Sequence, residues 1–261
     1  MKLSSDTCTL GIDIGSRTTK AVVFDGVNIR SRSMIPTGWS PAESAKKAAA
    51  EALKNAGLKD IRKIMLTGYG RISVKDFPAE IITEITAHAR GIGYLLPDTR
   101  TLIDIGGQDS KAIIVDEGGF VLDFAMNDRC AAGSGKFLEF LALTMDMDIE
   151  QFAETAYKSA SPVTISSICT VFAESEVLSL LAENVSVEDV AAGVHRSIAR
   201  RVTQMAKALH PHPPVSFSGG VARNKCMLRE LSRALGHDVR APEMPEYTGA
   251  LGAAIIACEG L

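Results

Sequence analysis

The strongest constraint on this chain is a pattern that it carries twice. One copy reads LGIDIGSRTTKAVVFD, and the other, 91 positions later, reads IDIGGQDSKAIIVD. Each copy predicts a β-hairpin, because an apolar strand is followed by glycine, a polar turn and a second apolar strand. At this offset the coinciding residues include Ile12 with Ile103, Asp13 with Asp104, Gly15 with Gly106, Lys20 with Lys111, and Asp25 with Asp116. One signature repeated in both halves predicts a duplicated domain.

The polar residues of the two hairpins indicate a shared chemistry. An aspartate within an apolar strand is costly to bury unless it is paired or holds a metal ion. Glycine at the turn lets a phosphate group approach the backbone N–H groups, and neighbouring hydroxyl and lysine side chains add donors and positive charge. A plain hairpin with a solvated turn would explain one copy, but two copies in register favour phosphate binding.

Around these hairpins the pattern is that of an α/β protein. In the first half, helices are expected from Pro41 to about Gly57 and over Ala79–Tyr94, with a short strand over Ile61–Thr67. We expect two duplicated lobes, each a mixed sheet flanked by helices, with a boundary near residue 100. The first lobe then covers residues 1–100 and the second covers residues 101–261.

The second half is mainly helical after its hairpin. Helical spacing is found over residues 136–145, 149–157, 170–183 and 187–209. A short strand, Val215–Gly219, is followed by Gly220, which we expect to open another helix. A strand, two glycines and a helix N-terminus favour a nucleotide contact, since the helix end offers free N–H groups and a positive dipole. A small-residue helix over Thr248–Ala257 completes the pattern.

Composition argues against several classes of protein. The chain is 46% hydrophobic and 23% charged, and its formal charge of −3 provides no general field for nucleic acid. No apolar run approaches the roughly 20 residues that span a bilayer. The first residues run directly into a strand, without the pattern of a signal peptide. We therefore expect a cytoplasmic protein that binds neither nucleic acid nor membrane.

The five cysteines do not form a disulfide pattern, because their number is odd, their spacing is wide and no CxxC is present. Burial as a small hydrophobic residue is the default for each of them. Two have a distinctive context. Cys130 directly precedes a small-residue run that predicts a helix start, and Cys169 directly precedes the helix expected from residue 170.

Two phosphate hairpins, a Gly-Gly turn and a small-residue terminal helix resemble the actin-like (ribonuclease H-like) ATPase superfamily. Within it, three segments are similar to the activators of 2-hydroxyacyl-CoA dehydratases, whose close relatives are the ATPase subunits of benzoyl-CoA reductase. These segments are DIGGQDSK (Asp104–Lys111), NDRCAAGSGKF (Asn127–Phe137) and CTVFAESE (Cys169–Glu176). The resemblance covers essentially the whole chain and implies an ATPase coupled to electron transfer.

The resemblance implies a homodimer with one 4Fe–4S cluster between its subunits, held by Cys130 and Cys169 of each chain. Two cysteines cannot complete the four-thiolate set of such a cluster, but a two-fold interface doubles them. The implied electron donor is a ferredoxin or flavodoxin. The implied acceptor is a cluster-bearing 2-hydroxyacyl-CoA dehydratase, which receives one low-potential electron when ATP is bound and hydrolysed.

The resemblance also assigns roles in the binding of ATP or ADP with Mg²⁺. Asp13 and Asp104 are the expected Mg²⁺ ligands, through water, since Mg²⁺ keeps part of its hydration shell. Asp104 is also a catalytic candidate, and Gln108 or Asp109 is expected to position the attacking water. The expected nucleotide contacts are Asp13, Gly15, Ser16, Arg17, Thr18, Thr19, Lys20, Gly106, Gly107, Gln108, Gly219, Gly220, Asn224 and Tyr247. Arg17 and Tyr247 depart from relatives, in which we expect a small hydroxyl residue and a glutamine.

Three alternatives use the same ATP hairpins. The partner could be a benzoyl-CoA-type reductase or another iron–sulfur protein. A small-molecule kinase of the same superfamily would need an acceptor site with a catalytic carboxylate and no cluster. A filament-forming actin relative is disfavoured by the short chain and by the two cysteines.

Overall fold

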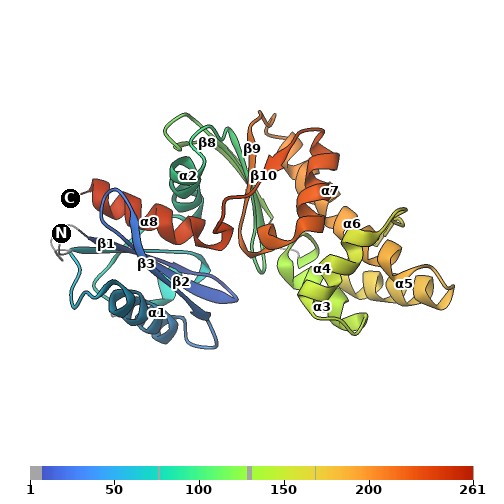
Figure 1. Ribbon diagram of the computed structural model, residues 1–261, viewed down its shortest axis with the longest axis horizontal. Coiled ribbons are helices and arrows are strands. Elements are labelled where there is room, and N and C mark those ends of the chain that lie inside the picture. Colours follow the sequence, from blue (N-terminus) through green and yellow to red (C-terminus); the bar gives the residue numbers. More distant parts are fainter. Residues whose placement is uncertain (1–7, 76, 128–130, 168, 261) are drawn as a thin grey trace. The chain divides into compact units, whose positions relative to one another are not determined.

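The computed structural model describes residues 8–75, 77–127, 131–167 and 169–260. The chain forms two compact units, each built mainly on one five-stranded sheet (Figure 1). The first unit comprises the chain up to Thr99, Val115–Leu122, and the chain from Glu246 onward. The second comprises Arg100–Ile114 and Asp123–Pro245. The boundary expected from the sequence, near residue 100, places residues 246–261 in the second lobe. In the structure these residues belong to the first unit.

The first sheet has the strand order β3-β2-β1-β4-β5. Its strands are β1 (Thr9–Ile14), β2 (Thr18–Phe24), β3 (Ile29–Pro36), β4 (Lys63–Thr67) and β5 (Glu80–Ile81). β1 pairs antiparallel with β2 and parallel with β4, and all six of its residues are buried. The central strand of the sheet is therefore the strand that carries Asp13.

Helices cover both faces of this sheet. They are α1 (Pro41–Ala56), α2 (Glu84–Leu95) and α8 (Thr248–Glu259). The alanines of α1 share a core with Leu10 and Ile12, whereas a Cβ on Gly11 would lie 2.0 Å from the carbonyl oxygen of Ala250 in α8. Because successive strand residues point to opposite faces, α1 and α8 cover opposite sides of β1.

The second sheet has the strand order β10-β9-β6-β7-β8. Its strands are β6 (Thr101–Ile105), β7 (Ser110–Val115), β8 (Val121–Asn127), β9 (Val215–Ser218) and β10 (Val239–Arg240). β6 pairs antiparallel with β7 and parallel with β9. Read from β8 to β10, this order matches that of the first sheet, because β8, β7, β6, β9 and β10 take the places of β3, β2, β1, β4 and β5.

The register of the hairpins confirms the duplication. Asp13 faces Lys20 across β1 and β2, and Asp104 faces Lys111 across β6 and β7. All five residue pairs of the second hairpin reproduce pairs of the first at the same offset of 91 positions. The two lobes are therefore two copies of one sheet, as the repeated sequence predicted.

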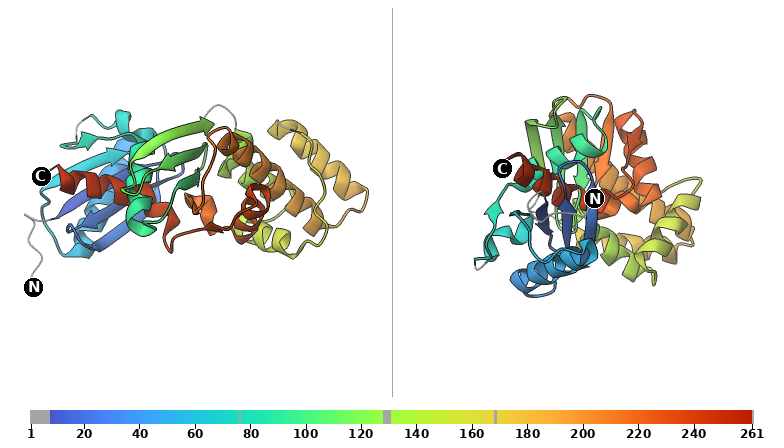
Figure 2. Two further views of the ribbon diagram at one scale, coloured as in Figure 1. Left: turned by 90° about the horizontal axis from the view of Figure 1, so that it is seen from above. Right: turned by 60° about the vertical axis from the view of Figure 1, so that its left-hand side comes forward.

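The second unit carries a group of helices beyond its sheet, coloured yellow-green to orange-red in Figure 2. They are α3 (Gly135–Thr144), α4 (Ile149–Lys158), α5 (Thr170–Ala182), α6 (Val187–Lys207) and α7 (Lys225–Leu235). α4 and α7 both pack against α6. The expected apolar stripe of α6 is buried at Val190, Val194, Ile198 and Val202, which confirms α6 as a core helix.

Two helix starts differ from the sequence-based prediction. The second helix begins at Glu84 rather than at Ala79, because the Thr83 side chain caps it and the preceding residues pair with β4 as β5. The helix expected to open at Gly220 begins instead at Lys225, after a 3-10 turn over Gly220–Arg223. None of the helices in the described ranges is long and apolar enough to cross a membrane.

Candidate functional site

The first hairpin brings its predicted phosphate-binding residues to one turn. Asp13 is buried at the end of β1, and its Oδ2 lies 3.5 Å from Nζ of Lys20. The turn between them is closed by a hydrogen bond from the N–H of Gly15 to the carbonyl oxygen of Thr18. Ser16 and Thr18 are half-buried, and Arg17 is exposed at the tip.

A residue directly after β3, which the sequence did not single out, supports this turn. The Thr37 hydroxyl donates to the carbonyl oxygen of Gly15 at 2.7 Å. The Thr19 hydroxyl lies 2.9 Å from the same Thr37 oxygen and is the donor of that pair, since the Thr37 proton is already used. Thr19 is thus buried in a structural network.

The second hairpin has the same turn and a tighter charge network. The N–H of Gly106 donates to the carbonyl oxygen of Asp109, as Gly15 does to Thr18. Lys111 is fully buried, and its Nζ lies 3.3 Å from Oδ2 of Asp104 and 2.8 Å from Oδ2 of Asp109. Of the two candidates for positioning water, Asp109 is therefore ion-paired, whereas Gln108 is exposed.

The two aspartates differ in how their carboxylates are satisfied. Each faces a hydroxyl residue on the parallel neighbour strand: Asp13 faces Thr67, and Asp104 faces Ser218. The Ser218 hydroxyl donates to Oδ1 of Asp104 at 2.7 Å. In the first unit, Oδ1 of Asp13 and Oγ1 of Thr67 are both buried and have no hydrogen-bond partner among the described residues. The first copy thus keeps unused oxygen ligands beside the hairpin.

A glycine follows each of these hydroxyl residues and brings the backbone against the aspartate strand. Gly68 and Gly219 both have φ of +87°. A Cβ on Gly68 would lie 2.3 Å from Oδ1 of Asp13, and a Cβ on Gly219 would lie 2.3 Å from the carbonyl oxygen of Ile105. Glycine is required at both positions by the backbone conformation and by the close approach. Only the second of the pair was predicted as a site residue.

The predicted adenosine region is centred on Asn224. Its Oδ1 accepts the N–H of Met227 and so caps α7, while its Nδ2 lies 2.9 Å from Nε2 of His195. Nδ1 of His195 lies 2.8 Å from the carbonyl oxygen of Ala191 and donates to it, so Nε2 accepts from Asn224. Burial lowers the pKa of His195 to about 4, which keeps the ring neutral. Gly220, five residues before Lys225, is exposed.

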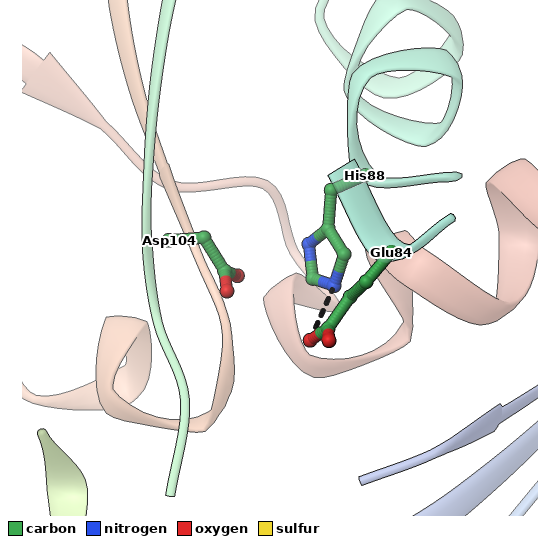
Figure 3. Close-up of side chains that lie close together, drawn as sticks. All are labelled: Glu84, His88 and Asp104. Carbon is green, nitrogen blue, oxygen red and sulfur yellow. Dashed lines mark ion pairs between the residues drawn. The ribbon is translucent and has the colours of Figure 1, made fainter. Parts of the chain in front are cut away.

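The start of α8 lies beside Asp13 in the first unit. A Cβ on Gly249 would lie 3.4 Å from Cγ of Asp13 and 2.7 Å from Nε2 of His88. His88 is buried on α2, with Nε2 4.0 Å from Oε1 of Glu84, one turn earlier (Figure 3). The sequence analysis missed His88, because nothing in the pattern of α2 separates it from a core residue. Figure 3 also draws Asp104, which β6 carries.

Tyr247, the last predicted nucleotide contact, immediately precedes α8. Its ring is buried, and the guanidinium of Arg32 lies over it, with Cζ 5.6 Å from the ring centroid. In the first unit Tyr247 therefore packs against Arg32, a residue of β3.

Cys169 is exposed and occupies the N-cap position of α5, as predicted. Its side chain makes no capping hydrogen bond. Val171 and Phe172, in the first turn, are 64% and 68% exposed. A thiol at the positive end of a helix dipole, with two exposed apolar residues in the same turn, has the setting of a ligand at an interface. Cys130, its predicted partner, lies outside the described residues.

The other cysteines match their default assignment. Cys8 and Cys226 are buried in the cores of the two units, and Cys258 is partly buried on α8. Burial raises the pKa of the Cys226 thiol to about 11, so this thiol is a poor metal ligand.

A family model described as the BadF/BadG/BcrA/BcrD ATPase family matches residues 10–257. The chain belongs to this family. A 2-hydroxyisocaproyl-CoA dehydratase activator from Clostridioides difficile is 41% identical over 252 residues, which cover 95% of this chain and 94% of the relative. A benzoyl-CoA reductase subunit from Thauera aromatica is 31% identical over 263 residues, which cover 95% of this chain and 92% of the relative.

Solved structures of BadF/BadG/BcrA/BcrD relatives share the whole fold. The activator of the 2-hydroxyisocaproyl-CoA dehydratase from Clostridium difficile with bound ADPNP matches with a TM-score of 0.91 at 41% identity, over 97% of this chain and 95% of that one. Component A of the (R)-2-hydroxyglutaryl-CoA dehydratase from Acidaminococcus fermentans matches with a TM-score of 0.93 at 39% identity, over 97% and 98%. The predicted resemblance, the actin-like fold and the assignment as an ATPase are thereby confirmed.

The described residues of this family member fit a hydrated Mg²⁺ ion in the first unit. Oδ1 of Asp13 and Oγ1 of Thr67 are buried oxygens on neighbouring strands, and neither has a partner in the described part of the chain. Oxygen ligands of this kind suit Mg²⁺, which is bound through one or two carboxylates and several waters. Asp104 differs, since Ser218 and Lys111 already engage both of its oxygens.

Proposed function

We propose that this chain is an ATP-dependent activator that passes one low-potential electron to a 2-hydroxyacyl-CoA dehydratase. The observation that carries the proposal is the exposed Cys169 at the start of α5, within the segment CTVFAESE that resembles the activators. The 41% identity to a dehydratase activator over nearly the full length of both chains supports the same conclusion.

The two hairpins supply the ATP-binding half of the proposal. Lys20 and Lys111 provide positive charge beside Asp13 and Asp104, and the turn glycines, which have no side chain, would let phosphate oxygens approach the backbone. Asp13 would hold Mg²⁺ through water, and Asp104 is the second proposed Mg²⁺ ligand and a catalytic residue. Gln108, which is exposed at the second turn, is better placed to orient water than the ion-paired Asp109.

Further residues would contact the adenosine moiety. Gly220 is exposed after β9 and follows the buried Gly219, and Asn224 keeps one amide hydrogen available after capping α7 and bonding His195. Tyr247 stands at the start of α8, where relatives are expected to carry glutamine. Arg17 would add a second positive charge, beside that of Lys20, at the first turn.

The cysteines supply the electron-transfer half. Cys130 and Cys169 of each subunit would hold one 4Fe–4S cluster in a homodimer, since a two-fold axis completes the set of four thiolates. When bound, that cluster supplies one-electron chemistry. The exposed Val171 and Phe172 would be buried around it by the second subunit. We infer a cytoplasmic location, with a ferredoxin or flavodoxin as donor.

A second candidate partner is a benzoyl-CoA-type reductase. The specific support is the benzoyl-CoA reductase subunit from Thauera aromatica, whose identity of 31% is lower than that of the dehydratase activator. Both candidates require the same ATP hairpins and the same cysteines, so the partner alone separates them. To distinguish the two, this chain is added with ATP to a purified dehydratase and, separately, to a purified reductase, and the two increases in activity are compared.

The decisive experiment measures iron and acid-labile sulfide per chain in anaerobically purified protein, together with its mass in solution. About two irons per chain in a dimer would support one shared 4Fe–4S cluster. An iron-free monomer that still hydrolyses ATP would overturn the electron-transfer proposal and favour a small-molecule kinase.

A further inference from the structure

Arg201, on α6, contacts two loops that are far apart in the sequence. Its Nη1 donates to the carbonyl oxygen of Ala132 at 2.7 Å, and its Nη2 donates to the carbonyl oxygen of Ser167 at 2.8 Å. The guanidinium also lies over the ring of Phe137, with Cζ 5.6 Å from the centroid. One half-buried side chain therefore joins two loops of the second unit that are 35 positions apart.

Both carbonyls belong to the segments that carry the proposed cluster ligands. Ala132 is the second residue after Cys130, and Ser167 is the second residue before Cys169. Each loop leads directly into a helix, since α3 begins at Gly135 and α5 begins after Cys169. Arg201 thus links the two segments in whose sequence Cys130 and Cys169 stand.

The second loop is also held from the opposite side. Glu176, on α5, accepts hydrogen bonds from the N–H of Ser166 at 2.9 Å and from the N–H of Ser167 at 2.8 Å. Burial raises the pKa of Glu176, but these hydrogen bonds outweigh it and hold the pKa below its ordinary value. The carboxylate is therefore charged at neutral pH. The Ser167 peptide is fixed at its N–H by α5 and at its carbonyl oxygen by Arg201.

Only arginine can make this pair of contacts from one side chain. Its planar guanidinium presents five N–H donors on three nitrogens, so Nη1 and Nη2 serve two carbonyl oxygens at once. Lysine has the same charge but carries all its donors on one nitrogen. The guanidinium also brings a permanent positive charge to the loops that precede and follow the proposed thiolate ligands.

We propose that Arg201 is a positioning residue, which holds the two cysteine-bearing loops of one subunit at the spacing that the shared cluster needs. This inference rests on the cluster of the proposed function. It extends that function by naming a residue that binds no metal and yet determines how firmly the metal is held. Partners of metal ligands have effects of this kind, since their loss typically weakens metal binding by about 10- to 100-fold.

The test compares Arg201→Gln and Arg201→Lys with Arg200→Gln in the anaerobically purified dimer. Arg200 is the matched control, because it is adjacent and exposed and makes no ion pair with a described residue. We expect Arg201→Gln to release iron to a chelator at least about tenfold faster than the wild type. Arg201→Lys should release iron at an intermediate rate and keep the redox potential near that of the wild type, because the charge remains. Arg200→Gln should match the wild type.

A second measurement separates this inference from the proposed function. Hydrogen–deuterium exchange is followed in peptides that span residues 131–137 and 163–171, with and without iron. If the wild type holds no iron, the proposed function fails. Faster exchange of both peptides in Arg201→Gln would still show that Arg201 holds the two segments together. Unchanged exchange, or iron release and an EPR spectrum equal to those of the wild type, would overturn the role of Arg201.

Discussion

The Ser218 hydroxyl donates a 2.7 Å hydrogen bond to Oδ1 of Asp104, which fixes this buried carboxylate between β6 and β9. The equivalent pair in the first unit, Thr67 and Asp13, shares the same strand pairing and makes no such bond. The duplicated sheets have therefore diverged at the residues closest to the proposed chemistry. One copy holds its aspartate by a protein donor, and the other leaves its aspartate oxygen for a ligand.

This divergence predicts unequal effects of removing the two hydroxyls. Ser218→Ala should lower the free energy of unfolding by about 1–3 kcal/mol, because a buried acceptor loses a donor. Thr67→Val should change it by less than about 0.5 kcal/mol, or raise it, because a buried hydroxyl without a described partner is replaced by a methyl group. Urea unfolding without nucleotide measures both values. Equal losses in the two variants would contradict the asymmetry.

The two aspartates predict a second comparison. Asp104→Asn should keep its iron and lose ATP hydrolysis by at least about 100-fold, since an electrostatic contact to the reacting phosphate is removed. Asp13→Asn should raise the Mg²⁺ concentration needed for half-maximal hydrolysis. Asp123→Asn, which changes an exposed carboxylate on β8, is the control. Unchanged turnover in Asp104→Asn would remove this residue from the catalytic site.

The buried His195 predicts a pH dependence of stability. Its pKa is lowered by burial from 6.5 to about 4 in the folded chain. Below pH 6.5 the unfolded chain therefore binds a proton that the folded chain does not, so stability falls as the pH drops from 6.5 towards 4. The full effect amounts to roughly 3 kcal/mol.

Urea unfolding at several pH values tests this dependence in the wild type and in His195→Gln. The variant should lose the part of the slope that lies between pH 4 and 6.5, because the glutamine amide does not titrate in this range. Parallel pH profiles for the two proteins would show that His195 does not titrate in this way.

The sequence predicted the hairpins well because each one is local and the chain repeats it in register. It placed Asp13, Lys20, Asp104 and Lys111 in their strands and Cys169 at a helix start. Helix starts at Glu84 and Lys225 were missed, because single caps, Thr83 and Asn224, override the hydrophobic pattern.

The remaining features depend on contacts between distant parts of the chain. The return of α8 to the first unit involves a hydrogen bond from Thr9 to the carbonyl oxygen of Ala254, 245 positions away. The Thr67-Gly68 pair at the end of β4 resembles the Ser218-Gly219 pair at the end of β9. This similarity is visible in the sequence, but two residues are too few to assign a role. The contacts of Arg201 with two loops have no sequence signature.

The final prediction concerns the cysteines and tests only the electron-transfer half of the proposed function. Cys130→Ser and Cys169→Ser should each abolish the cluster, because a shared site then keeps two thiolates where four are needed. Both variants should stay folded and bind ATP, since Cys169 is exposed and the hairpins are unaffected. Cys258→Ser, a partly buried cysteine in the first unit, should keep full iron content. Iron analysis, visible absorbance and nucleotide titration on the three variants check these outcomes, and full iron content in Cys130→Ser or Cys169→Ser would overturn the ligand assignment.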